Sequence, residues 1–311
     1  MTLTAWALTT GEAGMRTQAR GLAEAVADIV VEKVVAGGPA WPWRPRLPAD
    51  SLVPPWPDIV ISCGRRSAVR SIALRKTAGV PMLAVHVQDP RARNDAFDLV
   101  VAMDHDRIAA AGRVIKVSTA LHDITPAALA EASTVWAARL ARLGRPFAGV
   151  FIGGSLRGRP FTQEDGRRLL AGLRRLREAG IGLAVTPSRR TPAAVVSLLA
   201  NAFGEDNRVF LWDRTGDNPY RGILALADRL VVTSDSVSMV SEALATPHPV
   251  EVFDLGFARH VSFIGGLAAK GLIRRFVGEP APPPSTGPVN ATNIAAQAVR
   301  ALLQDRTGVV G

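Results

Sequence analysis

The chain of 311 residues has little of several residue types that would assign it to a class of protein. Its one cysteine, Cys63, excludes an intramolecular disulfide, and no group of Cys and His residues has the spacing of a zinc site. A run of about eighteen apolar residues, which a membrane-spanning helix needs, is absent, and so is the pattern of a secretory signal. We therefore expect a protein of the reducing cytoplasm, with Cys63 packed at the end of a strand rather than acting as a nucleophile.

Lysine is also scarce, so the formal net charge of +10 comes almost wholly from arginine. Arginine in place of lysine, with abundant alanine, glycine and proline, is typical of a GC-rich genome, and the basic residues are scattered. We therefore expect no nucleic-acid partner. One predicted helix is crowded with arginines, and its simplest interpretation is a solvated surface, with contact to anionic lipid or to a phosphorylated substrate as the alternative. These arginines are Arg167, Arg168, Arg174, Arg175 and Arg177.

The first half of the chain alternates short apolar runs with helical stretches, which indicates βαβ units and a parallel sheet. A Pro-rich segment with three tryptophans, 37–57, interrupts this pattern and is incompatible with regular structure. Its tryptophans either contact an acceptor or a membrane, or cover one edge of the sheet. The predicted strands are Leu3–Leu8, Ile29–Val35, Ile59–Ser62, Met82–Val87, Phe97–Val101 and Val114–Val117, and the predicted helices are Thr17–Ala27 and Ser67–Thr77.

A second alternating series follows a long helical stretch, Pro126–Leu143, so the chain is long enough for two α/β domains with separate cores. We expect a first domain over 1–125, a second over 146–285, and a final segment, 286–311, whose helix at about Asn290–Leu303 packs back on the first domain. The strands predicted in the second domain are Ala148–Ile152, Gly182–Val185, Val209–Leu211, Leu230–Val232 and Val250–Phe253.

The turn after Leu230–Val232 is the most informative stretch of the second domain. Ser234, Asp235 and Ser236 are residue types that cap helices, and the amides at a helix start face any phosphate placed there. Ser238 lies in the first turn of that helix, and Glu242 lies further along it, where its carboxylate suits a ribose diol. The alternative is a capped core helix with an ordinary exposed glutamate.

Three further polar turns follow strands of the same predicted sheet. Gly153 and Gly154 let backbone amides approach a phosphate, and Ser155 and Arg157 add a hydroxyl and a charge. After the next strand come Ser188 and Arg189, and guanidinium groups suit a pyrophosphate. The fourth turn holds Asn218 and Tyr220, the only tyrosine of the chain. Because ligands bind at the carboxyl ends of strands in open α/β sheets, the turns together predict a phosphate-containing ligand.

The first domain carries polar residues at the corresponding ends of its strands. Between the first strand and the first helix lie Gly11, Glu12, Gly14 and Gln18. Glu12 is a candidate general base, since partial desolvation in a cleft raises a carboxyl pKa, and the alternative is a solvated loop residue. Later strands are followed by candidate cleft residues, which are Gln88, Asp89 and His105.

Several of these stretches together resemble one family, the bacterial relatives of the plant mitochondrial-fission "elongated mitochondria" protein, over nearly the whole chain. The motifs are Gly11-Glu12-Ala13-Gly14 with Gln18, Gln88-Asp89-Pro90, Asp104-His105-Asp106, Ser188-Arg189-Arg190-Thr191-Pro192, Asn218-Pro219-Tyr220 and residues 233–243. Members of this family are described either by a role in mitochondrial fission or, loosely, as nucleoside-diphosphate-sugar epimerases.

A more distant likeness is to glycosyltransferases of the GT-B fold, which have two Rossmann-like domains, an inter-domain cleft and a carboxy-terminal helix on the first domain. Gly153-Gly154-Ser155 is similar to the donor-domain turn of the lipid-sugar transferase of peptidoglycan synthesis and of the Kdo transferases. Ser241-Glu242 is similar to the Ser-Glu whose carboxylate holds the donor ribose, and Thr10-Gly11-Glu12 to the turn with the Kdo transferase base.

The resemblance implies a metal-independent transfer of sugar from a nucleotide donor to a lipid or saccharide acceptor of the cell envelope. No cofactor is expected, because the nucleotide sugar is a substrate, and peripheral contact with the cytoplasmic face of the inner membrane is expected. Two alternatives stay open. One is a nucleotide-sugar epimerase of the same architecture, and the other is a non-enzymatic adaptor for membrane fission.

Overall fold

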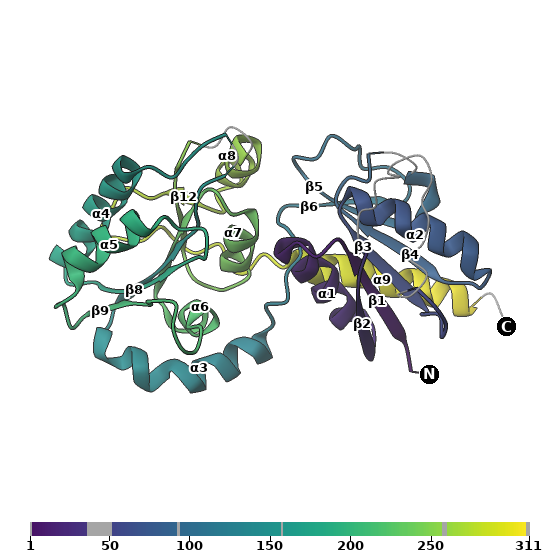
Figure 1. Cartoon of the computed structure of the whole chain (residues 1–311), viewed down its shortest axis with the longest axis horizontal. Helices are drawn as coiled ribbons and strands as arrows, with labels where there is room; N and C mark the ends of the chain where they lie inside the picture. Colours follow the sequence, from purple (N-terminus) through teal and green to yellow (C-terminus); the bar gives the residue numbers. More distant parts are fainter. Residues whose placement is uncertain (1, 36–51, 92–93, 157, 257–259, 309–311) are drawn as a thin grey trace. The chain divides into compact units, whose positions relative to one another are not determined.

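The computed structural model describes residues 2–35, 52–91, 94–156, 158–256 and 260–308, and its chain forms two compact units. The first unit comprises Met1–Asp123 with Asn290–Gly311, and the second comprises Ile124–Val289. Each unit holds a six-stranded parallel sheet with helices on both faces (Figure 1). The prediction of two Rossmann-like α/β domains is therefore confirmed.

The first sheet has the strand order β2-β1-β3-β4-β5-β6, and all its neighbours are parallel. The order reverses between β1 and β3, which is the ligand-binding position of a doubly wound sheet. Its strands are β1 (Thr4–Thr9), β2 (Ile29–Val34), β3 (Ile59–Cys63), β4 (Leu83–Val87), β5 (Leu99–Met103) and β6 (Val114–Val117). Its helices are α1 (Ala13–Val26), α2 (Arg65–Ala78) and α9 (Ala291–Gly308), with one short 3-10 helix, η1 (Asn94–Ala96).

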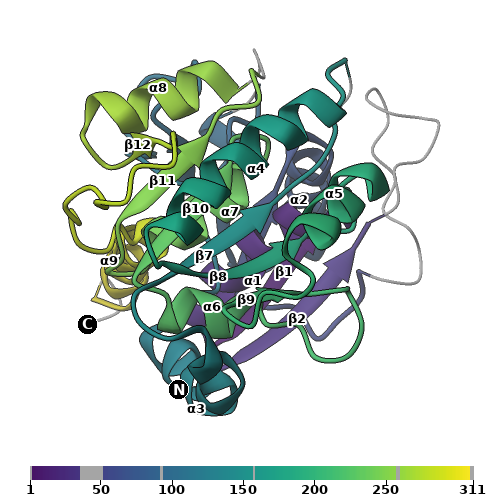
Figure 2. The same ribbon diagram turned by 90° about the vertical axis from the view of Figure 1, so that its left-hand side faces the viewer.

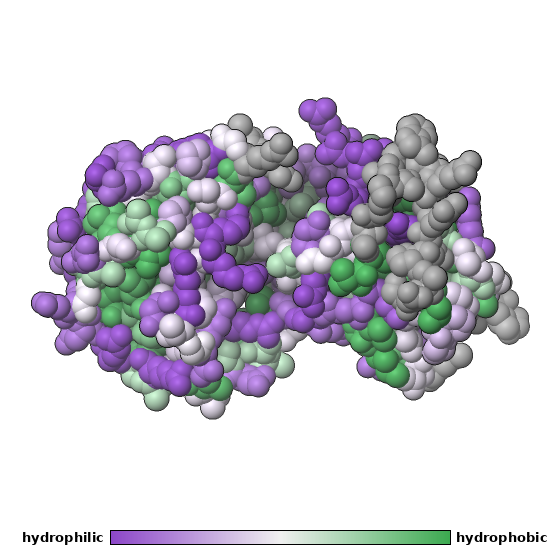
Figure 3. All heavy atoms as spheres, viewed as in Figure 1, coloured by the Kyte–Doolittle hydropathy of each residue, from purple (hydrophilic) through white to green (hydrophobic). Residues whose placement is uncertain are grey.

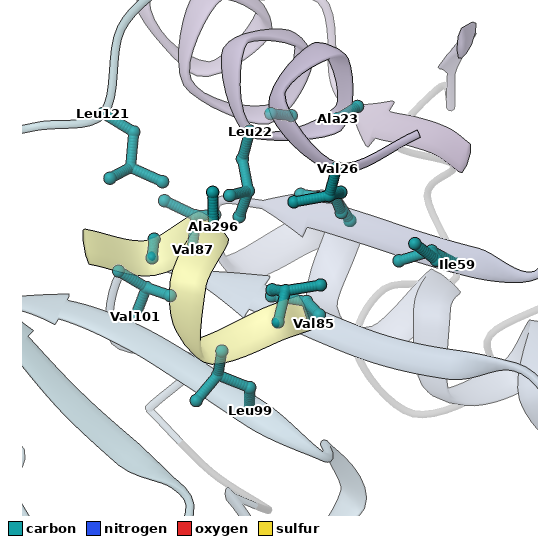
Figure 4. Packing of buried hydrophobic residues seen from close by; sticks show 14 of the residues in the cluster. Leu22, Ala23, Val26, Ile59, Val85, Val87, Leu99, Val101, Leu121 and Ala296 are labelled. Atoms are coloured by element: carbon teal, nitrogen blue, oxygen red, sulfur yellow. The ribbon is translucent and has the colours of Figure 1, made fainter. Parts of the chain in front are cut away.

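Alternate residues of each strand of this sheet reach opposite faces, as the pleat requires. Ile59 and Ile61 of β3 pack with α1 and α9, whereas Val60 between them packs with Leu74 of α2. Figure 4 shows the first of these layers, with labelled side chains of α1 and α9 turned toward those of β3, β4 and β5. The last helix thus completes the core of the first unit, where its alanines pack against α1.

The second sheet has the order β12-β11-β10-β7-β8-β9, again fully parallel. Its order reverses between β7 and β10. Its strands are β7 (Phe147–Ile152), β8 (Gly182–Pro187), β9 (Val209–Leu211), β10 (Arg229–Thr233), β11 (Val250–Phe253) and β12 (Arg274–Arg275). Its helices are α3 (Pro126–Leu140), α4 (Gln163–Glu178), α5 (Ala193–Phe203), α6 (Tyr220–Leu226), α7 (Val237–Leu244) and α8 (Val261–Ala269), and η2 (Ala141–Leu143) is a 3-10 turn.

Two hydrophobic layers hold this second sheet. Val150 and Ile152 of β7 pack with α4 and α5, whereas Phe151 packs with α3, α6, α7 and α8 on the opposite face. Figure 2 shows α4 and α5 crossing in front of the strands. A buried ion pair, Arg229 with Glu251, ties β10 to β11 inside the sheet, and Arg229 also donates to the carbonyl of Glu279. Both sheet faces are therefore covered, as an all-parallel sheet requires.

The first helix differs from its prediction. It begins at Ala13 rather than at Thr17, so Gly14 lies inside α1 together with Gln18 instead of in the turn before it. The side chain of its N-cap residue, Glu12, makes no capping hydrogen bond, so the sequence carried no capping signal for this start. Of the Pro-rich segment, residues 36–51 lie outside the described part of the chain, including Trp41 and Trp43. Among the described residues, no helix has the length and apolar character needed to cross a membrane.

Candidate functional site

The carboxyl ends of β7 and β10 are neighbours at the point where the order of the second sheet reverses. Two of the predicted donor motifs follow these strands, 153–155 after β7 and 234–236 after β10. In open α/β sheets, ligands bind in the crevice at such a reversal, because the flanking connections diverge to opposite faces. The fold thus brings together two motifs that are about 80 residues apart in the sequence.

Asp235 joins the turns of this edge, and its side chain has no exposed surface. One carboxylate oxygen accepts from the Gly154 amide at 2.7 Å and from Arg190 Nη2 at 3.1 Å, and the other accepts from Thr233 Oγ1 at 2.6 Å. In addition, Thr191 Oγ1, in the turn after β8, donates to the last carbonyl of β7 at 2.8 Å. The turns after β7, β8 and β10 therefore form one hydrogen-bonded network.

The glycines after β7 have a structural reason that differs from the predicted one. A Cβ on Gly153 would lie 2.1 Å from Oδ2 of Asp235, and a Cβ on Gly154 would lie 2.1 Å from the carbonyl oxygen of Arg190. The Gly153 amide donates to Thr233 Oγ1 at 2.8 Å, and the Gly154 amide donates to Asp235. We expected these amides to face a phosphate. In the structure a buried carboxylate and hydroxyl take them instead.

The hydroxyl groups of this edge also bond largely to the protein. Ser155 Oγ accepts from a backbone amide six residues further along at 2.9 Å, and Ser234 Oγ accepts from the amide two residues after β11 at 2.9 Å. Ser236 is the N-cap of α7, as predicted, and accepts from the amide three residues on. Ser238 lies half-buried in the first turn of α7, and Arg157 lies outside the described residues.

A pocket of about 450 Å³ opens beside these turns. Its volume falls in the range of sites for small molecules, roughly 300–1,000 Å³. Four residues that the sequence predicted for a donor, Ser188, Arg189, Asn218 and Tyr220, lie on its wall. The full lining consists of Thr186, Pro187, Ser188, Arg189, Trp212, Arg214, Asn218, Tyr220 and Met239. The pocket thus belongs to the carboxyl ends of β8 and β9 and to α6 and α7.

The aromatic wall of the pocket is fixed from behind. The ring of Tyr220 packs against Phe151 of β7, with ring centroids 4.7 Å apart, and Asn218 Oδ1 accepts from the Tyr220 amide at 3.0 Å where α6 begins. The Tyr220 hydroxyl donates to Oε2 of Glu242. Met239 and Glu242 are three residues apart on α7 and so share a face of that helix. The half-buried carboxylate of Glu242 therefore lies directly behind the lining residues.

The charge of the pocket wall is positive, since two arginines and, among the described residues, no acidic one line it. Arg189 is exposed at the end of β8, and Arg214 Nη2 donates to the Thr191 carbonyl at 2.9 Å. Arg214 holds a positive φ of 71°, which places it in a turn that few non-glycine residues adopt. Aromatic surface beside free guanidinium nitrogens is a combination that suits a planar base attached to phosphates.

Five of the nine lining residues were not among the predicted site residues, namely Thr186, Pro187, Trp212, Arg214 and Met239. Trp212 directly follows β9, so the rule that ligands lie at carboxyl ends of strands was sufficient to include it; its Nε1 donates to the Thr215 carbonyl at 2.8 Å. Arg214 carried no motif, because its position depends on the turn conformation. Thr186 is the penultimate residue of β8, and its buried Oγ1 has no hydrogen-bond partner in the described part of the protein.

The predicted base, Glu12, lies on an exposed turn after β1. It accepts a hydrogen bond from Thr10 Oγ1 at 2.5 Å. Gly11 before it has a φ of 95°, a conformation that favours glycine. Gln18 is buried within α1 and donates to the Gly14 carbonyl at 3.0 Å, which is a helix-internal contact. Among the candidates Gly11, Glu12, Gly14 and Gln18, Glu12 is therefore the one with a charged side chain, and within the first unit that side chain is exposed to solvent.

The other candidates of the first unit follow β4 and β5. Gln88 comes directly after β4 with a φ of 80°, and its backbone N–H donates to the Val101 carbonyl at 2.8 Å. Asp89 Oδ1 accepts from the Arg91 amide at 2.7 Å, and His105 lies half-buried in the turn after β5. The structure thus places all three at the carboxyl edge of the first sheet.

Cys63 is the last residue of β3 and is fully buried, as the sequence predicted for a packing residue. Burial raises the pKa of its thiol far above the ordinary value, and the nearby charge of Glu12 raises it further. A thiol that stays protonated is a poor nucleophile. Cys63 is therefore not a candidate nucleophile.

Comparison with known proteins gives the family. The model of the family described as "Mitochondrial fission ELM1" matches residues 13–303, which is most of the chain. The chain belongs to this family. The family resemblance expected from the sequence motifs is therefore confirmed.

Two curated relatives of this ELM1-family chain come from a plant and a bacterium. "Mitochondrial fission protein ELM1" from Arabidopsis thaliana is 29% identical over 276 residues, covering 80% of this chain and 65% of the plant protein. "Uncharacterized protein RP120" from Rickettsia prowazekii (strain Madrid E) is 26% identical over 255 residues, covering 71% of this chain and 72% of that protein. The chain thus spans less than two thirds of the length of the plant relative.

Solved structures with the same architecture include epimerases and a glycosyltransferase. UDP-GlcNAc 2-epimerase from Methanocaldococcus jannaschii aligns with a TM-score of 0.58 at 11% identity, over 97% of this chain and 99% of the other. The Neisseria meningitidis enzyme bound to UDP-GlcNAc gives 0.55 at 11% identity, over 97% and 100%. The glycosyltransferase SnogD from Streptomyces nogalater gives 0.53 at 11% identity, over 90% and 88%. At such low identity the likeness shows the fold, which is GT-B-like.

Proposed function

We propose that this ELM1-family protein is a metal-independent glycosyltransferase that uses a nucleotide-sugar donor. The observation that carries the proposal is the 450 Å³ pocket of the second unit, where Ser188, Arg189, Asn218 and Tyr220 meet at the carboxyl ends of β8 and β9. Purely structural turns have no reason to surround a cavity with guanidinium groups and aromatic rings. A nucleoside diphosphate combines the base, ribose and phosphates that this lining complements.

In this proposal each part of the donor has its own residues. The base stacks on Trp212 or Tyr220, since base–aromatic stacking is favourable for every base. Arg189 and Arg214 bind the diphosphate with charge-assisted hydrogen bonds, with help from the Ser188 hydroxyl. The sequence had assigned phosphate binding also to the glycine turn. Because Thr233 and Asp235 take the two amides there, we now assign the phosphates to the arginine side of the pocket.

Glu242 is the residue we propose for the ribose diol, whose two hydroxyl groups donate to a carboxylate. Its Oε2 already accepts from the Tyr220 hydroxyl, so the tyrosine orients the carboxylate while its ring faces the pocket. Charge-assisted hydrogen bonds of this kind are about twice as strong as neutral ones. Tyr220 and Glu242 therefore act as a pair in donor binding.

For the transfer step we propose Glu12 as the general base. It takes the proton of an acceptor hydroxyl, the acceptor oxygen forms a bond to the anomeric carbon, and the bond from that carbon to the donor phosphate breaks. The nucleoside diphosphate leaves with the electron pair, and arginines stabilise its charge without a metal. The acceptor we propose is a lipid or saccharide of the cell envelope. In this proposal the protein is cytoplasmic and reaches the acceptor by attaching peripherally to the inner membrane.

The first experiment is a thermal-shift screen of the purified protein with UDP-, GDP-, CMP- and dTDP-sugars. At a donor concentration of about 100 times Kd, binding adds about 2.7 kcal/mol to the free energy of unfolding, which raises Tm by several degrees. We expect one nucleotide class to raise Tm, and the shift to be lost in Glu242→Gln and weakened in Tyr220→Phe. Glu164→Gln, an equal change at an exposed residue of α4, serves as the matched control and keeps the shift.

The outcome also separates the alternative functions. No shift with any donor, together with unchanged partner capture by Glu242→Gln, supports the adaptor. If a donor binds, incubation without acceptor followed by NMR of the sugar separates the two enzymes. An epimerase forms a free epimer, whereas the proposed transferase forms a product only with an acceptor and loses turnover, but not donor binding, in Glu12→Gln.

A further inference from the structure

A second pocket, of about 260 Å³, lies on the second unit beside α4. Its lining differs from that of the larger pocket, because no residue is common to the two. It is formed by Arg168, Ala171, Arg175, Phe253, Asp254, Arg275, Phe276 and Val277. Three arginines and one aspartate give these side chains a formal charge of +2. None of these residues belongs to the proposed donor site.

The spacing along α4 explains why a hollow exists there. Arg168, Ala171 and Arg175 are separated by three and four residues and therefore share one face of the helix. The short side chain of Ala171 leaves a gap between the two long arginine side chains. Figure 2 shows α4 in front of the strands, and Figure 3 shows hydrophilic side chains over much of this end of the unit.

The walls of this second pocket are held by specific contacts. Arg168 Nη2 donates to the Asp254 carbonyl at 2.8 Å, and its guanidinium carbon lies 5.2 Å from the ring centroid of Phe253. Arg175 Nη2 donates to the Val277 carbonyl at 2.6 Å. These contacts anchor the end of each arginine side chain, and Arg168 Nη1 also donates to Asp165 Oδ1 at 3.4 Å, while a guanidinium group with five N–H donors keeps others for a ligand.

The loop after β12 packs closely against α4. A Cβ on Gly172 would lie 2.7 Å from Cε1 of Phe276, so a glycine at this point of α4 lets the aromatic ring approach. Phe276 is buried, and the exposed Arg275 beside it adds a third guanidinium group to the rim. The floor of the pocket, with buried Phe253 and Phe276, is therefore part of the packed structure, and the three arginines form its exposed rim.

Two of the three arginines lack a neutralising carboxylate. Arg168 pairs with Asp165 at 3.4 Å, whereas no carboxylate in the described part of the chain lies within ion-pair distance of Arg175 or Arg275. Guanidinium groups that converge without counter-charge bind phosphate oxygens strongly and with defined geometry. The volume is below the roughly 300–1,000 Å³ of small-molecule sites, so it suits a phosphate or diphosphate group better than a whole nucleotide sugar.

We propose that this pocket, formed by Arg168, Arg175 and Arg275, binds the phosphate group of a ligand other than the nucleotide-sugar donor. The phosphate belongs either to a phospholipid or lipid-linked headgroup or to a soluble phosphorylated molecule. Two further arginines of α4, Arg167 and Arg174, are exposed but do not line the pocket. The site does not depend on the proposed transfer reaction.

The test uses the full chain with two kinds of probe. In the first arm, inorganic pyrophosphate is titrated by calorimetry into wild type and into Arg175→Gln/Arg275→Gln. We expect the double variant to lose about tenfold or more in affinity, because two charge-assisted contacts are removed. The matched control is Arg167→Gln/Arg174→Gln, which removes the same charge from α4 outside the pocket and keeps the affinity within about twofold.

The second arm measures co-sedimentation with phosphatidylcholine vesicles, with and without phosphatidylglycerol. Pocket-dependent binding to the anionic vesicles identifies a lipid source, and pocket-dependent pyrophosphate binding without vesicle binding identifies a soluble one. Equal losses in the two double variants overturn the proposal, since general surface charge then explains the binding. Loss of pyrophosphate binding in Arg189→Gln alone also overturns it, because the anion then occupies the donor pocket, and absence of binding to either probe overturns it as well.

Discussion

The carboxyl edges of the two sheets are built from similar polar residues but are held in different ways. In the second unit, buried Asp235 bonds to turns that are 45 and 81 residues away in the sequence. In the first unit, exposed Glu12 and half-buried Asp89 bond to residues two positions away in their own turns. A carboxylate that cross-links several turns preorganises them for one ligand, whereas a carboxylate that bonds only within its own turn leaves that turn easier to adapt. The difference agrees with a fixed donor site in the second unit and a variable acceptor side in the first.

The largest effect we expect is from Asp235→Ala. It leaves the Gly154 amide and the buried Thr233 Oγ1 without their acceptor, and each buried group left unsatisfied costs about 1–3 kcal/mol. Arg190, which is half exposed, loses its partner but is solvated by water. Asp89→Ala, the matched change in the first unit, shifts stability by less than about 0.5 kcal/mol. Urea unfolding of both variants measures this difference. Equal losses would show that the two edges are held alike.

A slightly smaller effect is expected from adding one methyl group at Gly154. The Cβ of Gly154→Ala would lie 2.1 Å from a backbone oxygen, which cannot move without displacing the turn after β8, and such overpacking costs about 3 kcal/mol. In Gly11→Ala the Cβ meets only Val34 Cγ1 at 3.3 Å, so the cost is the positive φ, about 1 kcal/mol. The measurement is peptide-resolved hydrogen exchange. Faster exchange at β8 in Gly154→Ala, with no change there in Gly11→Ala, is the expected pattern.

Much of this fold could be predicted because apolar runs in a parallel sheet are bounded by polar turns. Val114–Val117, Val209–Leu211 and Val250–Phe253 have the predicted bounds. The strand that the prediction omitted, β12, consists of Arg274 and Arg275 and so has no apolar run. This strand pairs with β11, and the side chain of Glu251 on β11 also accepts a hydrogen bond from the Arg274 side chain. Signals of this kind depend on residues far apart in the sequence.

The candidate site was predictable as a set of turns but not as a set of contacts. The strand-end rule found Ser188, Asn218 and Tyr220, and it also applies to Trp212. It could not show that Asp235 takes the amide of Gly154, because that bond joins two turns 81 residues apart. A sequence states which residues are polar, whereas burial decides whether their partners are in the protein or in a ligand. The inter-domain cleft and the role of Glu12 stay predictions.

In the first unit the sensitive point is inside the core rather than at the edge. His86 of β4 is fully buried, and burial lowers its pKa to about 3; Ser62 Oγ lies 2.8 Å from its Nδ1 and Phe97 packs beside its ring. A histidine that is neutral in the folded state but ionises near pH 6.5 when unfolded stabilises the fold above pH 6.5. This contribution is lost as pH falls toward 3, by about 1.4 kcal/mol per pH unit.

The measurement is the free energy of unfolding from urea titrations at pH 6.5, 5.5 and 4.5, for wild type and His86→Gln. We expect the wild type to lose about 1.4 kcal/mol more per unit than the variant, whose amide does not titrate. His248→Gln in the second unit is the control, since burial also lowers the pKa of His248, but that side chain is less buried. Parallel profiles of wild type and His86→Gln would show that His86 is protonated without unfolding.

The smallest effect compares the two helices that start at the reversal points of the sheets. Ser236 accepts from the Met239 amide and so caps α7, whereas Glu12 holds the same position on α1 without a capping bond. Ser236→Ala therefore costs about 1 kcal/mol, and Glu12→Ala costs less than about 0.5 kcal/mol. Thermal unfolding of the two variants measures both values. A large loss in Glu12→Ala would mean that this turn is structurally constrained after all, and the contrast between a preorganised edge and an adaptable one would then fail at the residue proposed as the base.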